Sequence, residues 1–177
     1  EPGAEAAADR PRHGACAGRR VLAPGCYGRR RGETTARLRA GAHLEGEHDV
    51  IAEGRCYCGA LRYRAEGEPV FKGQCHCREC QYISGGHPNA VMGMPAASFQ
   101  YTKGEPKLFK RSDLANPVTR EFCALCGTHI LGRSPGLPGA VLLKVGTLDD
   151  PSIYGGPQMV IFTIDKQTFH HVPEGVM

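Results

Sequence analysis

Seven cysteines fall in three short-spaced groups, and this spacing constrains the fold of the chain more than any other feature. A C-x-C pair, a C-x-C-x-x-C trio and a C-x-x-C pair follow one another: Cys56 and Cys58; Cys75, Cys77 and Cys80; Cys123 and Cys126. Short-spaced thiols are typical of sites that hold a soft cation. Four thiolates from the outer pairs would complete one tetrahedral zinc site, whereas the trio would leave one position open.

The outer pairs predict a structural site. Residues i and i+2 of a strand point to one side, so Cys56 and Cys58 are expected to share one ion. After Cys123 the chain should turn tightly, with backbone N–H groups directed at its sulfur and Gly127 at positive φ. The ion would connect two hairpins across the 64 residues between the pairs, so its removal should loosen the whole domain. The alternative is a set of buried free thiols.

The trio of Cys75, Cys77 and Cys80 predicts an open, catalytic zinc site. The vacant position would accept water or a substrate thiolate, which zinc keeps ionised and nucleophilic. Arg78 is expected to temper the negative charge or to meet a substrate carboxylate. Two alternatives remain: His76 completes a second structural site, or two of the three thiols form a disulfide. His76 should point to the opposite side of a strand from its neighbours, which favours the open site.

Residues 1 to about 48 differ in composition from the rest of the chain. Nine arginines and one acidic residue lie between positions 10 and 39, and large apolar side chains are few. Such a segment cannot bury enough surface to offset the entropy lost on ordering. We therefore predict a disordered or non-native leader over residues 1–50 and one folded domain over residues 51–177. An RNA-binding arm and an organelle transit peptide are the alternatives for the leader.

Charge and hydropathy exclude several classes of function. From Glu53 onward there are 13 basic and 11 acidic residues, so a dedicated nucleic-acid surface on the domain is not expected. No apolar run approaches the ~18 residues of a membrane helix, and no membrane association is predicted. The cysteine spacing suits metal ligands better than disulfides, and no secretory segment precedes the domain. These features favour a reducing, cytoplasmic compartment.

Short strands separated by glycine and proline account for most of the predicted domain. A hairpin is expected at residues 55–64, with Cys56 and Cys58 in its first strand and a turn at Gly59-Ala60. Further strands are expected at residues 70–75, 90–94, 99–102, 107–110, 119–123, 129–133, 140–145 and 159–164. Only residues 77–83 predict a helix, because no long stretch has a helical period. The predicted class is all-β, built from short antiparallel strands.

The order and spacing of the motifs resemble one known family. The motifs are C-x-C-G at residues 56–59, C-H-C-x-x-C at 75–80 with Ser-Gly at 84–85, F-C-x-x-C-G-T-H at 122–129, and V-G-T-L-D-D-P at 145–151. Together they resemble the glutathione-dependent formaldehyde-activating enzyme family, also called the Gfa-like or centromere-protein-V domain, from about Ile51 to the C-terminus. The resemblance implies a β-tent of short antiparallel sheets organised around zinc.

The resemblance also implies a role for each cysteine group and a reaction. It implies a structural zinc held by the outer pairs, Cys56, Cys58, Cys123 and Cys126. It implies a labile, catalytic zinc held by the trio, Cys75, Cys77 and Cys80. The implied reaction is condensation of glutathione with formaldehyde to S-(hydroxymethyl)glutathione, formally a carbon–sulfur lyase run in reverse. Candidates to bind the glutathione carboxylates are Arg78, Lys110, Arg111 and Arg133.

Two other functions are compatible with the sequence. The chain could be a non-enzymatic zinc module that binds a thiol or a partner protein, with a trio that only buffers metal. It could also bind nucleic acid through the arginine-rich leader, although the near-neutral domain counts against this. Loss of activity without loss of folding, when the trio is altered, would separate an enzyme from a structural module.

Overall fold

The structure is a computed structural model, and it describes residues 49–176. Nearly all of the predicted leader, residues 1–50, therefore lies outside the described residues, as do Cys16 and Cys26. The described strands are β1 Val50–Arg55, β2 Arg62–Gly67, β3 Phe71–Cys75, β4 Asn89–Pro95, β5 Gln100–Lys103, β6 Lys107–Phe109, β7 Thr119–Phe122, β8 His129–Arg133, β9 Ala140–Lys144 and β10 Met159–Ile161. The α-helix is α1, Arg78–Ser84, and the 3-10 helices are η1 Ala96–Ser98, η2 Val145–Thr147, η3 Pro151–Tyr154 and η4 Thr163–Asp165.

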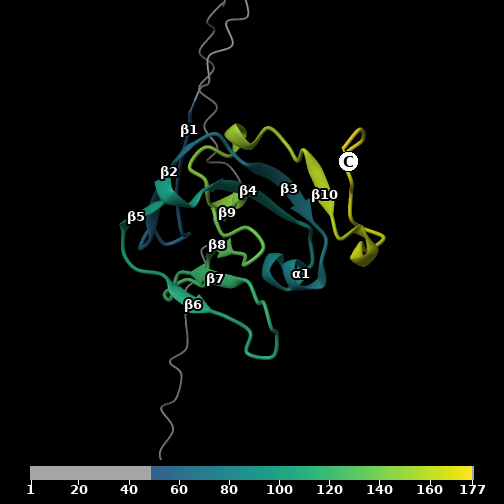
Figure 1. The fold of residues 1–177 in the computed structure, drawn as a ribbon, viewed down its shortest axis with the longest axis horizontal. Coiled ribbons are helices and arrows are strands. Elements are labelled where there is room, and N and C mark those ends of the chain that lie inside the picture. The colour runs from purple at the N-terminus through teal and green to yellow at the C-terminus, as the bar shows by residue number, and fades with distance from the viewer. Residues whose placement is uncertain (1–48, 177) are drawn as a thin grey trace, which may run out of the picture. The chain divides into compact units, whose positions relative to one another are not determined.

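The strands form two sheets, which confirms the all-β prediction. The small sheet has the order β1-β2-β5, and the large sheet has the order β10-β3-β4-β9-β8-β7-β6 (Figure 1). The short helix was expected at residues 77–83 and is α1, which ends at Gly85 in a left-handed conformation with φ 73°. No helix within residues 49–176 combines the length and the hydropathy that a membrane-spanning segment needs.

Two expectations about strands are wrong. Cys56 and Cys58 do not belong to a strand, because β1 ends at Arg55 and the pair lies in the turn before β2. The sheets are also not wholly antiparallel, since β10 pairs with β3 in parallel. A parallel neighbour needs a long crossover connection, and here more than 80 residues of chain separate the two paired strands.

The main core lies between the two sheets and follows the alternation of the strands. On β4, Met92 and Met94 are fully buried, and Leu143 of β9 lies beside them in the same apolar cluster. The small sheet contributes Tyr63 and Ala65 of β2. Burying each large side chain of this kind stabilises the fold by about 2 kcal/mol. Because side chains alternate along a strand, the residues next to these core positions face the other side of the large sheet.

The residues between the core positions point to the other face of the large sheet. On β9 these are Leu142 and Lys144, and on β4 they include Val91. Figure 1 shows α1 between the β3–β10 end of the sheet and the β7–β6 end. An ion pair of 2.6 Å between Glu79 of α1 and Arg120 of β7 holds the helix in this place. The helix thus covers part of this face and leaves a cavity over the rest.

Candidate metal centres and the adjoining cavity

Cys56 and Cys58 lie in the turn between β1 and β2. The N–H of Cys56 donates to the carbonyl of Leu61 at 3.1 Å, and the N–H of Gly59 donates to the carbonyl of Cys56 at 3.0 Å. The N–H of Leu61 also donates to Cys56 Sγ at 3.2 Å. This contact offsets negative charge on a sulfur, as metal-bound thiolates require. A tight turn, rather than a strand, therefore brings this pair of thiols together.

Cys123 and Cys126 occupy a similar turn between β7 and β8. The N–H of Cys123 donates to the carbonyl of Thr128, and the N–H of Gly127 to the carbonyl of Cys123, both at 2.9 Å. Gly127 has φ 71°, the positive value that the sequence predicted. Thr128 Oγ1 accepts from the N–H of Tyr57 at 3.2 Å and lies 3.2 Å from Cys126 Sγ. Hydrogen bonding by Thr128 lowers the pKa of Cys126 to about 5, which favours a thiolate.

The two turns place four thiols in one group. Sγ of Cys58 lies 3.5 Å from that of Cys56 and 3.8 Å from that of Cys123, and all four sulfurs are within 4.8 Å of one another. Ligands of a tetrahedral zinc with Zn–S bonds of ~2.3 Å are about 3.8 Å apart. The donor type and the spacing therefore fit zinc. The group joins a turn of the small sheet to a turn of the large sheet.

The trio forms a second group where β3 passes into α1. Cys75 ends β3, Cys77 is the N-cap of α1, and Cys80 lies in the first helical turn. Their sulfurs all lie within 4.8 Å of one another. Cys77 Sγ accepts from the backbone N–H of Cys80 at 3.4 Å, so the cap places the Cys77 thiol beside the residue that carries the third thiol. Asn89 Nδ2 of the adjoining strand donates to Cys80 Sγ at 3.5 Å.

Negative charge in the trio is best placed on Cys80. Hydrogen bonds from Cys75, then from Cys77 and Asn89, lower the pKa of the Cys80 thiol. The same contacts raise the pKa of Cys75, because its neighbours hold the charge in its place. A cation at the group would remove this competition and allow all three thiols to ionise. Three clustered soft donors also fit zinc.

His76 points away from the trio, as the alternation along the chain predicted. It is fully buried, and its Nδ1 lies 3.2 Å from Nδ1 of His170. His170 Nδ1 accepts from the N–H of Gln167, so His76 is the donor between the two rings. The second nitrogen of His170 donates to the carbonyl of Gly86 at 2.7 Å. Within residues 49–176, no His, Asp or Glu joins either cysteine group as a further ligand, and none of the described cysteines is in a disulfide.

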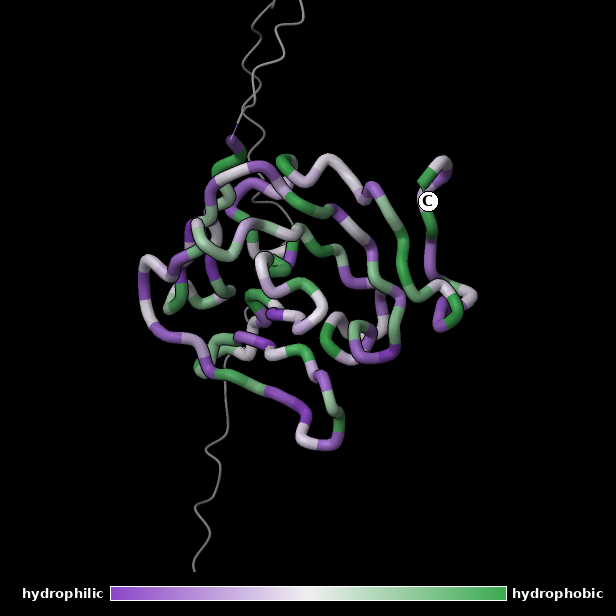
Figure 2. The backbone as a smooth tube through the Cα atoms, viewed as in Figure 1, coloured by the Kyte–Doolittle hydropathy of each residue, from purple (hydrophilic) through white to green (hydrophobic). Residues whose placement is uncertain are grey.

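A cavity of about 850 Å³ adjoins the trio. All three trio cysteines line it, and most of its wall is apolar, including Phe71, Val91, Val118, Leu137, Leu142 and Met159. Figure 2 shows β10, whose Met159 and Ile161 line the cavity, as a hydrophobic stretch. The volume lies within the range of about 300–1,000 Å³ typical of small-molecule sites. The trio is thus accessible from a space that can hold an organic substrate.

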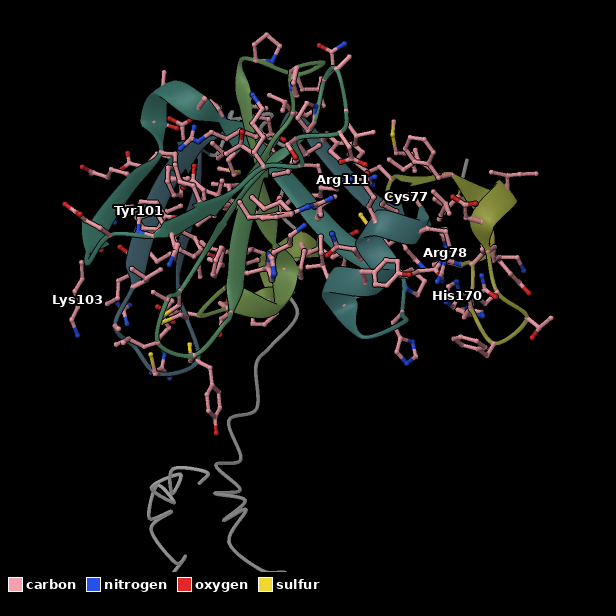
Figure 3. The ribbon with its side chains drawn as sticks, turned by 90° about the horizontal axis from the view of Figure 1, so that it is seen from below. Cys77, Arg78, Tyr101, Lys103, Arg111 and His170 are labelled. Carbon is pink, nitrogen blue, oxygen red and sulfur yellow. The ribbon has the colours of Figure 1, made fainter. Side chains whose placement is uncertain are left out.

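Arg78 also lines the cavity, and Figure 3 shows it near Cys77. Its guanidinium donates to Gln81 Oε1 and lies over the ring of Tyr82, 5.3 Å from the centroid. The role of Arg78 toward a carboxylate remains a prediction. Of the other candidate cations, Arg111 pairs with Asp113 and Glu79, Arg133 pairs with Glu121, and neither lines this cavity.

The sequence did not single out two cations of the cavity wall, Arg120 and Lys144. Arg120 is committed to its ion pair with Glu79, whereas burial lowers the pKa of Lys144 below its usual range. The sequence signal that could have placed Lys144 in the cavity is weak. Lys144 is the one charged residue at the end of the apolar run Ala140–Lys144, and only the register of the sheet shows which face it occupies.

Phe162 also lines the cavity, in a strained conformation, and no sequence pattern predicted it as a site residue. Its φ is 56°, in the left-handed region that bulky residues rarely adopt, and it is 57% exposed. Such a conformation costs of the order of 1–3 kcal/mol. Phe162 directly follows the parallel strand β10. Phe162 therefore lies on the wall of the cavity and outside the core cluster.

Comparison with models of known protein families shows which family contains this chain. Residues 51–165 match the family described as glutathione-dependent formaldehyde-activating enzyme. The chain belongs to this family. Membership suggests a glutathione-related, formaldehyde-activating function, and both cysteine groups of this Gfa-family domain are compatible with zinc.

A crystal structure of a Rhodobacter sphaeroides protein is also similar to the Gfa-family chain. The two sequences are 18% identical, and the match covers 59% of this chain and 96% of the other, with a TM-score of 0.47. No curated protein matches the sequence significantly.

Proposed function

We propose that this protein catalyses the reversible addition of glutathione, or another small thiol, to formaldehyde or a related aldehyde. It would be a zinc-dependent carbon–sulfur lyase of the S-(hydroxymethyl)glutathione synthase type. One observation carries the proposal: three thiols, without a fourth ligand among the described residues, line a cavity of substrate size. The match to the family supports the reaction class.

The trio and the residues around it would serve this reaction directly. Zinc held by Cys75, Cys77 and Cys80 would supply a Lewis acid and keep a thiolate ionised at neutral pH. Asn89, through its hydrogen bond to Cys80, would orient that ligand. Arg78 would meet a carboxylate of the thiol substrate at the cavity wall.

The reaction balances without an oxidant or a reductant. The thiol gives up its proton, its sulfur forms a bond to the carbonyl carbon, and the π electrons of the carbonyl move to oxygen. That oxygen then takes a proton. The residues around the cavity therefore need only to hold two reactants and accommodate a developing negative charge on oxygen.

The outer group would be structural in the same proposal. Zinc held by Cys56, Cys58, Cys123 and Cys126 would hold the two sheets together. The cavity wall contains none of these four residues. Their alteration should therefore change folding first and activity only as a consequence.

A Cys77→Ser variant tests the function. Serine is a strong N-cap residue, so α1 should keep its cap while the trio loses a thiolate. We expect one zinc per chain instead of two by metal analysis, an unchanged circular dichroism spectrum, and loss of the enzyme-accelerated exchange between glutathione and S-(hydroxymethyl)glutathione in NMR exchange spectra. Unchanged acceleration in the variant would contradict the proposal. A folded, fully loaded wild type without acceleration would favour a non-enzymatic zinc module.

We further propose the domain boundary at residue 51 and a cytoplasmic location. A chain that lacks residues 1–48 should keep the zinc content and the exchange rate of the whole chain. Loss of either would show that the boundary is wrong. Nucleic-acid binding that disappears with this deletion would instead support the leader as a binding arm.

A further inference from the structure

The cavity face of the large sheet is organised in cross-strand rows. The row farthest from the trio joins Phe71, Gly93, Leu142 and Gly132 on four neighbouring strands. Two of the four positions are glycines, and neighbouring apolar side chains cover them: a Cβ atom at Gly93 would come within 3.2 Å of Val70 Cγ2. A Cβ atom at Gly132 would come within 3.1 Å of Val118 Cγ1, which is part of the cavity wall. This end of the cavity is therefore walled by apolar side chains.

The next two rows lead from the apolar end to the thiols. The middle row contains Val91 and Lys144, which are paired across β4 and β9. The last row contains Cys75 and Asn89, paired across β3 and β4. Successive rows lie two residues apart along the strands, or about 7 Å, so the three rows span about 13 Å. Lys144 thus lies between the apolar row and the reactive group.

Within the described residues, Lys144 is the cation of this cavity whose side chain makes neither a hydrogen bond nor an ion pair with a carboxylate, and the trio thiols are the groups that attract its charge. Arg120 pairs with Glu79 at 2.6 Å, and Arg78 contacts Gln81 and Tyr82. In the part of the chain that the structure describes, Lys144 Nζ makes no ion pair with a carboxylate and no hydrogen bond. The Lys144 ammonium lies on the cavity wall and is therefore free to donate a hydrogen bond to a ligand in the cavity.

We propose that this cavity binds the apolar body of the substrate aldehyde, with the carbonyl oxygen at Lys144 and the carbonyl carbon at the trio. The inference rests on the proposed function and names its substrate class as an aldehyde with a medium-length alkyl chain, such as octanal. Formaldehyde has no body to fill the apolar row. The step is the addition described above: the C–S bond forms, and the oxygen that gains negative charge accepts a hydrogen bond from the Lys144 ammonium.

A chain-length series measures this preference in turnover. Butanal, hexanal and octanal have similar carbonyl groups and differ in the number of methylenes that the apolar row can bury. With the zinc-loaded whole chain and glutathione, kcat/KM for formation of the hemithioacetal should rise about tenfold with each pair of methylenes. In a Leu142→Trp variant, which adds an indole to the apolar row, the ratio of octanal to butanal kcat/KM should fall.

Binding of unreactive carboxylates tests the site without catalysis. By calorimetry, octanoate should bind the zinc-loaded protein more tightly than butanoate. Lys144→Met should weaken octanoate binding about 10- to 100-fold, because it removes a charged hydrogen bond and keeps an apolar chain of similar length. Lys107→Met, on the exposed edge strand β6, is the matched control and should leave the affinity unchanged.

The outcomes separate this inference from the proposed function. Turnover of formaldehyde with glutathione, combined with no chain-length dependence in kcat/KM or in affinity, overturns the aldehyde assignment and leaves the lyase standing. Octanoate binding that depends on Lys144, with no turnover of any aldehyde, overturns the lyase and the aldehyde assignment together. Chain-length dependence in both measurements, reduced by Lys144→Met, supports both.

Discussion

The two cysteine groups of this domain differ in how the chain assembles them. The outer group needs two turns that are far apart in sequence and belong to different sheets, so it exists only when both sheets are in place. The trio comes from one short segment at the end of β3 and the start of α1, and it opens on a cavity. The difference teaches that ligands of the same type can stabilise a fold when they connect remote elements and serve chemistry when they share one local segment.

Loss of an outer thiol should have the largest effect. In Cys123→Ala, the turn between β7 and β8 loses a ligand, and we expect a decrease of more than about 4 kcal/mol in the free energy of unfolding, because binding of a structural zinc contributes directly to folding. Urea unfolding followed by circular dichroism measures it. Cys77→Ser is the matched comparison and should shift the midpoint little. Equal destabilisation by the two variants would remove the distinction between the groups.

A smaller effect is expected at the ion pair that holds α1 against β7. Glu79→Gln leaves Arg120, which is 9% exposed, with an uncompensated charge, and should lower the free energy of unfolding by about 2 kcal/mol. Glu53→Gln breaks an exposed pair with Arg64 and should change the free energy of unfolding by less than about 0.5 kcal/mol. Denaturant titration compares the two variants. If both variants lower the free energy of unfolding equally, the position of α1 does not depend on the Glu79–Arg120 pair.

An effect smaller than that of Glu79→Gln should come from a hydrogen bond between the small sheet and η2. Tyr63 of the small sheet and Thr147 of η2 are joined at 2.8 Å in a buried position. Tyr63→Phe leaves Thr147 with its bond to the carbonyl of Lys144, so a loss of about 1 kcal/mol is expected in thermal unfolding. An effect as large as that of Cys123→Ala would show that this contact, rather than the metal group, joins the sheets.

Much of the fold could be predicted because its signals are local. Alternation and glycine or proline breaks place most strands, and the spacing of the cysteines groups them correctly. Alternation also directs His76 away from the trio, as observed. The turn at Cys56 and Cys58 was predicted as a strand because i and i+2 geometry and a tight turn can both bring two thiols together.

The cavity could not be predicted because it depends on register. Lys144 meets Val91 only through the pairing of β9 with β4, and the strand β10 that borders the space pairs in parallel with the distant β3. No local pattern determines such contacts. The left-handed backbone of Phe162, the residue before η4, likewise has no signal in the sequence around it.

Stepwise removal of zinc tests most directly whether the two groups have different roles. The zinc-loaded whole chain is titrated with a chelator while released zinc, circular dichroism and the rate of glutathione–aldehyde exchange are followed together. We expect release in two phases: the first equivalent of zinc leaves with the exchange activity while the fold is retained, and the second leaves as the protein unfolds. Release of both equivalents in one phase, with unfolding from the start, would contradict the account.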